Sequence, residues 1–202
     1  MSTPYMTRVA IANRAGVPLL SMRVMHMFGD QALEVLVWDT AIESGEGKLS
    51  DTRNVSYVVG FGDVTKYDRW LVSWRMVEAG QEFICTTAPS LFDLVGDYLI
   101  VQEDGSVGAI VDTSDVTKSM SEMGGSLAKL QFGAIACKVD ESQLKEHVLR
   151  EEDAYDPAHP ADIGLKLLIG DDATVTFESP SGNSQAGYAK MAVPHDLPAA
   201  GY

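Results

Sequence analysis

The fold of this chain is decided by the stretch Thr7-Arg8-Val9-Ala10-Ile11-Ala12-Asn13-Arg14-Ala15-Gly16. Apolar and polar residues alternate along it, and it ends in a turn that carries Asn and Gly, as a half-buried antiparallel strand does. A second stretch of this kind lies near the other end of the chain, Ala173-Thr174-Val175-Thr176-Phe177-Glu178-Ser179. Both outer parts of the chain therefore predict a β-sheet framework.

Five strands are predicted before residue 80, over residues 8–13, 20–27, 33–38, 55–59 and 69–77. Side chains of a strand alternate between its two faces. In the second strand, one face therefore carries Leu20, Met22, Val24 and His26, and the other carries Met25 and Met27. In the fifth strand, Trp70, Trp74 and Met76 lie opposite Arg69. Some of these large side chains must line a second surface besides the core.

The hydrophobic period changes after Pro89-Ser90. Apolar residues with helical spacing predict a helix over residues 91–99, which Ser90 would cap. A second helix is predicted from Ser114 to Gly124 and a third from Ser126, with Leu127, Leu130 and Ala134 facing inward. The segment of about residues 90–137 is thus expected to be a helical insertion between strands.

The C-terminal part returns to the strand pattern. Residues 141–153 fit either helix or strand. Residues 166–169 and 173–179 predict a hairpin closed by Gly170-Asp171-Asp172, and Pro180-Ser181-Gly182 would end the last strand. The predicted fold is mainly β with an α insertion: one antiparallel β-sandwich-like domain over residues 1–188, followed by a C-terminal tail over 189–202.

Composition limits the partners. The chain has 202 residues, 46% of them hydrophobic, and a formal net charge of −14. This charge, with no Lys/Arg cluster to offset it, disfavours nucleic acid and anionic lipid surfaces. No apolar run has the length of a membrane span or of a signal-peptide core, so a cytoplasmic protein is expected. There, Cys85 and Cys137 are expected to be buried free thiols.

Five segments together resemble a known family. They occur in order over about residues 8–188: Val9 to Gly16 with Asn13, Val24-Met25-His26, Asp68-Arg69-Trp70-Leu71-Val72-Ser73-Trp74, His147-Val148-Leu149-Arg150-Glu151-Glu152-Asp153, and Thr174 to Ser184. This order resembles the fungal and nematode family called the Up-regulated in Daf-two domain. The resemblance implies a compact β-sandwich-like domain and brings no catalytic set. The chain departs from the family pattern at Val59-Gly60-Phe61, which replaces Asn-Thr-Gly, and at Arg69, which replaces a second tryptophan.

Common catalytic motifs do not occur. Acyl transfer would need a Gly-x-Ser-x-Gly elbow, and the sequence has none. The acidic stretch from Glu151 to Asp162 lacks the glycine and spacing of a calcium loop, and Gly60-Phe61-Gly62 is not followed by a dinucleotide-binding pattern. We therefore expect neither a metal nor a cofactor. A thiolate pair of Cys85 or Cys137 with His26 or His147 would depend entirely on the fold.

An apolar set of side chains interleaved with a few polar groups fits a pocket for an apolar small molecule. The predicted substrate-binding residues are Met22, Trp38, Tyr57, Phe61, Trp70, Trp74 and Met76. The simpler alternative for each is a place in the sandwich core. The candidate catalytic residues are His26, Arg69, Asp68, Tyr67 and Asp63.

We expect such a pocket to enclose a terpenoid, polyketide or lipid. Fungal secondary metabolism would supply such molecules, and a cofactor-free cyclase or isomerase would fold a flexible substrate and stabilise developing charge. Two alternatives stay open: a non-catalytic lipid- or membrane-binding module, and a protein-interaction module that pairs through its sheet edges, including as a homo-oligomer.

Overall fold

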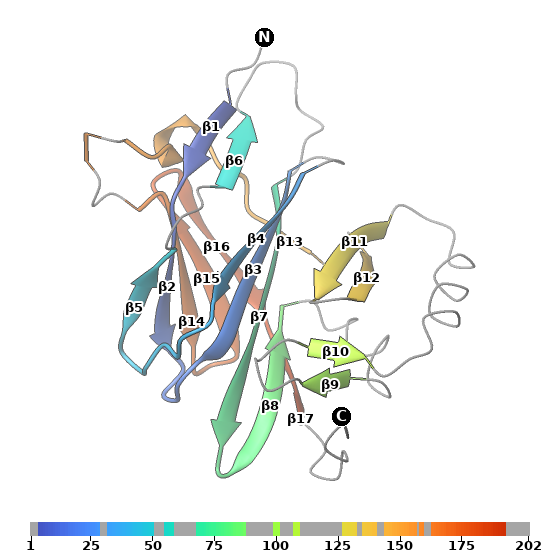
Figure 1. Cartoon of the computed structure of the whole chain (residues 1–202). Coiled ribbons are helices and arrows are strands. Elements are labelled where there is room, and N and C mark those ends of the chain that lie inside the picture. The colour runs from blue at the N-terminus through green and yellow to red at the C-terminus, as the bar shows by residue number, and fades with distance from the viewer. Residues whose placement is uncertain are drawn as a thin grey trace.

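The computed structural model describes residues 4–28, 32–50, 55–58, 68–87, 99–101, 107–109, 127–132, 135–140, 144–156, 158–159 and 163–192. Two sheets form the body of the molecule, with the five-stranded sheet on the left of Figure 1 and the six-stranded sheet in its middle. The six-stranded sheet has the order β17-β8-β7-β3-β4, and β13 also pairs with β7. Its strands are β17 (Ala189–Ala192), β8 (Gln81–Thr86), β7 (Asp68–Glu78), β3 (Leu20–Phe28), β4 (Ala32–Trp38) and β13 (Lys145–Glu146).

The five-stranded sheet has the order β16-β15-β14-β2-β5. Its strands are β16 (Gly182–Gly187), β15 (Thr174–Ser179), β14 (Leu165–Gly170), β2 (Val9–Arg14) and β5 (Gly47–Leu49). The strand pairs described are antiparallel except β14 with β2, which run parallel. The mainly antiparallel β-sandwich expected from the sequence is confirmed.

Shorter elements complete the described structure. Three two-stranded sheets pair β1 (Pro4–Thr7) with β6 (Val55–Val58), β9 (Leu99–Val101) with β10 (Val107–Ala109), and β11 (Leu127–Phe132) with β12 (Ile135–Asp140). One 3-10 turn, η2, covers Glu151–Asp153. Figure 1 draws the hairpins β9–β10 and β11–β12 on the side of the six-stranded sheet away from the five-stranded sheet.

The core lies between the two sheets. The six-stranded sheet contributes the side chains of Met22, Val24, Trp70, Val72 and Trp74, and β2, β14 and β15 contribute aliphatic residues and Phe177. Alternation along the strands accounts for this, because every second residue of β3 and β7 faces the opposite sheet. Burial of these large apolar side chains is the main favourable term in folding.

A β-bulge in β3 corrects one predicted face. Leu20 lies opposite Arg75, whereas Arg23 lies opposite Ser73, so β3 has one residue more than β7 between these pairs. Ser21 takes up the extra residue with a φ of 49°. Leu20 therefore shares the face of Arg75 and not that of Met22, Val24 and His26. Strict alternation from the sequence cannot detect such an insertion.

The expected helical insertion is wrong where the structure describes it. The predicted third helix coincides with strands β11 and β12, in which Leu130 lies opposite Cys137 and Phe132 opposite Ile135. Leu127 and Leu130 have helical spacing, but Ile135, Cys137 and Val139 recur at every second position, as the residues on one face of a strand do. The predicted first helix ends within β9, at Leu99. Residues 91–98 and the predicted second helix lie outside the described residues.

The C-terminal hairpin is confirmed, because β14 and β15 pair antiparallel around residues 171–173. Two further strands follow it: β16 pairs with β15, and β17 pairs with β8. Residues 189–192, expected in the tail, therefore belong to the six-stranded sheet. Strand β8 was also not predicted. Its turn is Ala79-Gly80, with both φ angles positive, and Ala-Gly is a weaker hairpin signal than Asn-Gly.

Asn13 holds the turn at the end of β2. Its side-chain Nδ2 donates to the carbonyl oxygens of Val17 and Ile42, each at 2.8 Å, and its Oδ1 accepts from the amide of Ala15 at 2.9 Å. The residue is fully buried. Buried backbone groups need such partners, because an unpaired one has lost its water without compensation.

We predict that Asn13→Ala lowers the free energy of unfolding by about 3 kcal/mol, because it removes three side-chain hydrogen bonds to backbone groups, two of them buried. Urea denaturation followed by tryptophan fluorescence measures this. The matched control is Asn183→Ala, at an exposed position of β16, which should change the value by less than about 0.5 kcal/mol. Equal midpoints for the two variants would contradict the assigned role of Asn13.

Candidate functional site

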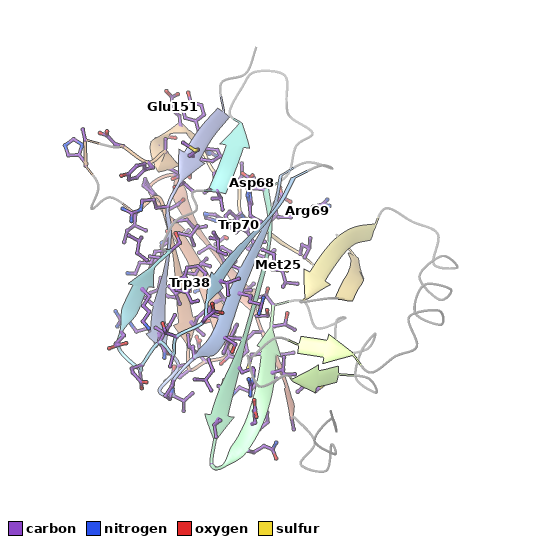
Figure 2. All side chains as sticks on the ribbon, in the orientation of Figure 1. Met25, Trp38, Asp68, Arg69, Trp70 and Glu151 are labelled. Carbon is purple, nitrogen blue, oxygen red and sulfur yellow. The ribbon has the colours of Figure 1, made fainter. Side chains whose placement is uncertain are left out.

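Buried polar side chains gather at one end of the sandwich, under a segment that we call the strap (residues 144–156). Asp68, on β7, accepts the amide of Leu149 at its Oδ2 (2.7 Å) and the amide of His147 at its main-chain oxygen (3.1 Å). Trp70 Nε1 donates to the carbonyl of His147 at 3.0 Å. Asp68 and Trp70 therefore fix the middle of the strap to the six-stranded sheet (Figure 2).

The far part of the strap is held by Asp153, which is fully buried. Its Oδ1 accepts from the amide of Ser181 (2.8 Å), and its Oδ2 accepts from the Ser181 hydroxyl (2.6 Å) and from the amide of Arg150 (2.7 Å). Its main-chain oxygen accepts from the Thr7 hydroxyl. Gly164 permits this approach, because a Cβ there would lie 2.1 Å from that oxygen.

His26 and Asp68 form a buried pair. Nε2 of His26 lies 3.1 Å from Oδ1 of Asp68, and the two residues are 1% and 2% exposed. The His26 ring stacks on the indole of Trp70, with the ring centroids 4.2 Å apart. The cross-strand register explains this contact, since His26 and Trp70 are direct partners on β3 and β7. Asp68 thus contacts His26 through Oδ1 and the strap through Oδ2.

His147 is a second buried histidine at the same end. Its Nδ1 lies 2.9 Å from the hydroxyl of Ser184, and its Nε2 is buried without a hydrogen-bond partner. Burial lowers the pKa of His147 below its ordinary 6.5. Asp153 and Asp68 act in the opposite direction, and Lys145 acts with the burial. Protonating this ring would place a charge among apolar neighbours such as Phe177, whose ring centroid is 5.5 Å away.

These groups do not form a hydrolytic triad. In such a triad, one histidine contacts the serine with one ring nitrogen and the acid with the other. Here the Asp68 carboxylate contacts the His26 ring, whereas the Ser184 hydroxyl contacts the His147 ring, so the acid and the serine contact different histidines. The arrangement therefore holds the strap between the two sheets, and it offers no activated serine.

The predicted catalytic residues separate into three groups. His26 and Asp68 meet, as described. Arg69 is on the opposite face of β7, pointing away from the five-stranded sheet (Figure 2). Tyr67 and Asp63 lie outside the described residues. Their catalytic roles stay predictions, and for the buried pair the contacts themselves fit a structural role.

The predicted substrate-binding residues lie mostly in the inter-sheet core. The six that the structure describes there are 0–5% exposed: Met22, Trp38, Tyr57, Trp70, Trp74 and Met76. Phe61 lies outside the described residues. Tyr57 donates its hydroxyl to the carbonyl of Arg150 at 2.9 Å, and Trp74 packs edge-on against Tyr188 at 4.7 Å between ring centroids. The indole Nε1 of Trp74 is buried without a hydrogen-bond partner.

A second covered surface lies on the other side of the six-stranded sheet. We call it the outer face and define it by residues that the strand registers place together: Arg23, Met25, Leu71, Ser73, Ile84 and Thr86. Met25 is 2% exposed, Leu71 1% and Ile84 6%, although none of them belongs to the inter-sheet core. The sequence predicted that Met25 would face a second surface, and this is confirmed.

Polar and apolar side chains form separate rows on the outer face. Cross-strand pairing places Arg23, Ser73 and Thr86 side by side on β3, β7 and β8. Met25 and Leu71 form the next row on one side, and Ile84 lies on the other side. The Nε of Arg23 is buried without a hydrogen-bond partner. Sequence reasoning did not single out Arg23.

The remaining candidates for chemistry are accounted for locally. Cys85 is a buried free thiol, and burial raises its pKa to about 12, so it is a thiol and not a thiolate at neutral pH. Among the described residues, no group of His, Cys, Asp and Glu side chains could hold a metal ion. Within those same residues, no helix is long and apolar enough to cross a membrane.

We predict that Asp68→Ala lowers the free energy of unfolding by about 3–5 kcal/mol, because it removes the buried carboxylate that contacts His26 and accepts the amide of Leu149. Amide hydrogen exchange should show loss of protection at Leu149 before the sheets open. Asp156→Ala is the matched control, because the Asp156 carboxylate is exposed and, within the described residues, forms hydrogen bonds only with its near neighbours Ala158 and His159. Unchanged protection at Leu149 would show that Asp68 does not hold the strap.

We also predict that His147 makes the fold sensitive to acid. Its pKa is lower in the folded than in the unfolded chain, so below pH 6.5 the unfolded chain binds a proton that the folded chain does not. The stability present above pH 6.5 is therefore lost as the pH falls toward the folded pKa. Urea titrations from pH 7 to 5 should show a smaller loss for His147→Gln than for the unaltered protein. The exposed His159 provides the control His159→Gln, which should keep the loss; equal slopes for all three proteins would contradict this role.

The model of the family described as "Up-Regulated in long-lived daf-2" matches residues 3–188, which include both sheets as far as Tyr188 and the whole strap. No curated protein matches the chain significantly. Since the family model covers almost the whole length of the chain, the chain belongs to the Up-Regulated in long-lived daf-2 family.

Proposed function

We propose that this protein binds an apolar small molecule, of the size of a terpenoid, polyketide or lipid, against the outer face of its six-stranded sheet. The observation that carries the proposal is the burial of Met25 and Leu71 outside the inter-sheet core. Apolar walls with a few polar groups are typical of small-molecule sites. Thioether side chains also adapt to irregular shapes, which suits Met25 for contact with a guest.

The outer face is a better location for this site than the inter-sheet core. Large aromatic side chains fill the core, among them Trp70, Trp74 and Tyr57. They pack against other core residues at ordinary distances; the ring centroids of Trp70 and Phe177, for example, are 6.3 Å apart. Placing a guest there would require large side chains to leave a close-packed interior. We therefore propose the outer face of β3 and β7, and not the face toward the five-stranded sheet, as the binding surface.

Binding would be the primary activity, with catalysis as an extension of it. A site that holds a flexible chain in one folded shape already lowers the entropy cost of cyclisation or isomerisation. A cation such as Arg23 would stabilise negative charge that develops on the bound molecule. We also propose a cytoplasmic location, which the buried free thiol of Cys85 supports.

The test is titration of the purified protein with Nile red, a neutral apolar dye whose fluorescence rises on leaving water. We predict saturable binding that Met25→Gln weakens about tenfold or more, because a polar amide replaces a buried apolar contact. Val77→Gln is the matched control, since Val77 is on the same face of β7 but is 44% exposed. Leu71→Ala provides a second variant if Met25→Gln folds poorly, and a urea midpoint checks each protein.

Two outcomes would overturn the proposal. One is the absence of saturable dye binding, and the other is equal weakening by Val77→Gln and Met25→Gln. Co-sedimentation with phosphatidylcholine vesicles tests the non-catalytic membrane alternative, which predicts partition to the vesicles with no dependence on Met25. Mass spectrometry of small molecules that co-purify with the protein would then identify the natural guest.

A further inference from the structure

We propose that the guest of the outer face is an amphipathic acid, and that Arg23 binds its carboxylate while Met25, Leu71 and Ile84 contact its apolar part. This inference rests on the proposed binding at the outer face and adds the chemical class of the ligand. Four observations support it: the unpartnered guanidinium nitrogen, its place in the row of polar residues, the bulge beside it and the charge of the rest of the chain.

The first observation is the state of the Arg23 guanidinium. Its Nε is buried and donates no hydrogen bond, and among the described residues Arg23 forms no ion pair. A buried donor of a charged group without a partner is costly. Arg75, on the same face, differs because it pairs with Glu82. Arg23 is therefore a half-buried cation whose charge is available to an anion.

The second observation is the shape of the surroundings. Arg23 is the direct neighbour of Ser73 across β3 and β7, and Met25 follows it on the same face beside Leu71. A carboxylate placed at Arg23 would thus lie beside the polar row, with the apolar row two residues further along β3 and β7. A molecule with a charged head and a hydrocarbon body matches both rows at once, whereas a purely apolar molecule would leave the guanidinium unpaired.

The third observation is the β-bulge. The extra residue of β3, Ser21, lies two positions before Arg23, between the pairs Leu20–Arg75 and Arg23–Ser73. Ser21 adopts a left-handed φ of 49° there, which a residue other than glycine adopts at a cost. Bulges re-aim the side chains next to them. This one sets the position of Arg23 relative to Ser73 and separates it from the ion pair of Arg75.

The fourth observation is the formal net charge of −14. This charge disfavours the binding of an anion wherever no nearby cation offsets it. At physiological ionic strength this general repulsion is screened beyond about 8 Å. A bidentate contact with a guanidinium at short range is then stronger than the distant repulsion. An acid should accordingly bind at Arg23 and at few other places on this surface.

The experiment compares dodecanoate with dodecanol as competitors of Nile red at pH 8. The two molecules have the same hydrocarbon chain, and they differ in the charged head. We predict that dodecanoate displaces the dye at a concentration about tenfold lower than dodecanol, and that Arg23→Gln removes this preference while it leaves displacement by dodecanol within about twofold. Arg23→Lys should restore part of the preference, because lysine supplies charge without the planar fork.

The matched control is Arg14→Gln, which removes the same charge from an exposed position of the five-stranded sheet and should keep the preference for the acid. Equal displacement by acid and alcohol in the unaltered protein would overturn the inference and leave the proposed function standing. A preference that survives Arg23→Gln would overturn the role of Arg23. Failure of both competitors to displace a bound dye, or failure of the dye to bind, would instead remove the proposed function.

Discussion

The carboxylate of Asp68 is the contact on which the rest of this end of the molecule depends. One of its oxygens pairs with His26 and the other accepts the amide of Leu149, so a single side chain joins β3, β7 and the strap. An acid can be buried at this depth because its oxygens have partners. The strap then reaches Asp153, where Ser181, in the β15–β16 turn, continues the connection to the five-stranded sheet, and Thr7 continues it to β1.

A second constraint is that β7 is covered on both sides. Trp70, Val72 and Trp74 face the inter-sheet core, and Leu71 and Ser73 on the other face are also buried. An antiparallel sheet commonly leaves one face in water, and that face then carries polar residues. The run Trp70-Leu71-Val72 departs from this pattern because both faces need apolar side chains. The six-stranded sheet therefore has a second covered surface besides the inter-sheet core.

Several features were accessible from the sequence because they depend on neighbours along the chain. The period of two in residues 8–13 and 173–179 identified β2 and β15, and the Gly-Asp-Asp turn identified the hairpin of β14 with β15. Strand parity placed Met25 opposite Met22. By contrast, the Leu127 and Leu130 spacing gave a false helix, because strands β11 and β12 are defined by pairing with each other. The bulge at Ser21 was also inaccessible, since an extra residue in one strand has meaning only against its partner strand.

The sequence by itself determined the sandwich class, the acidic surface and the set of large side chains that must be buried, because these follow from composition and local period. Only the tertiary structure decided which polar residues meet. Asp68 and Leu149 are far apart in the chain, and so are His147 and Ser184, and no local pattern encodes such contacts. The same holds for Arg23: its charge is visible in the sequence, but the lack of a partner results from the strands that surround it. The energy of a polar contact depends on the distance between its two groups in the folded chain. The local periodicity of the sequence does not determine that distance.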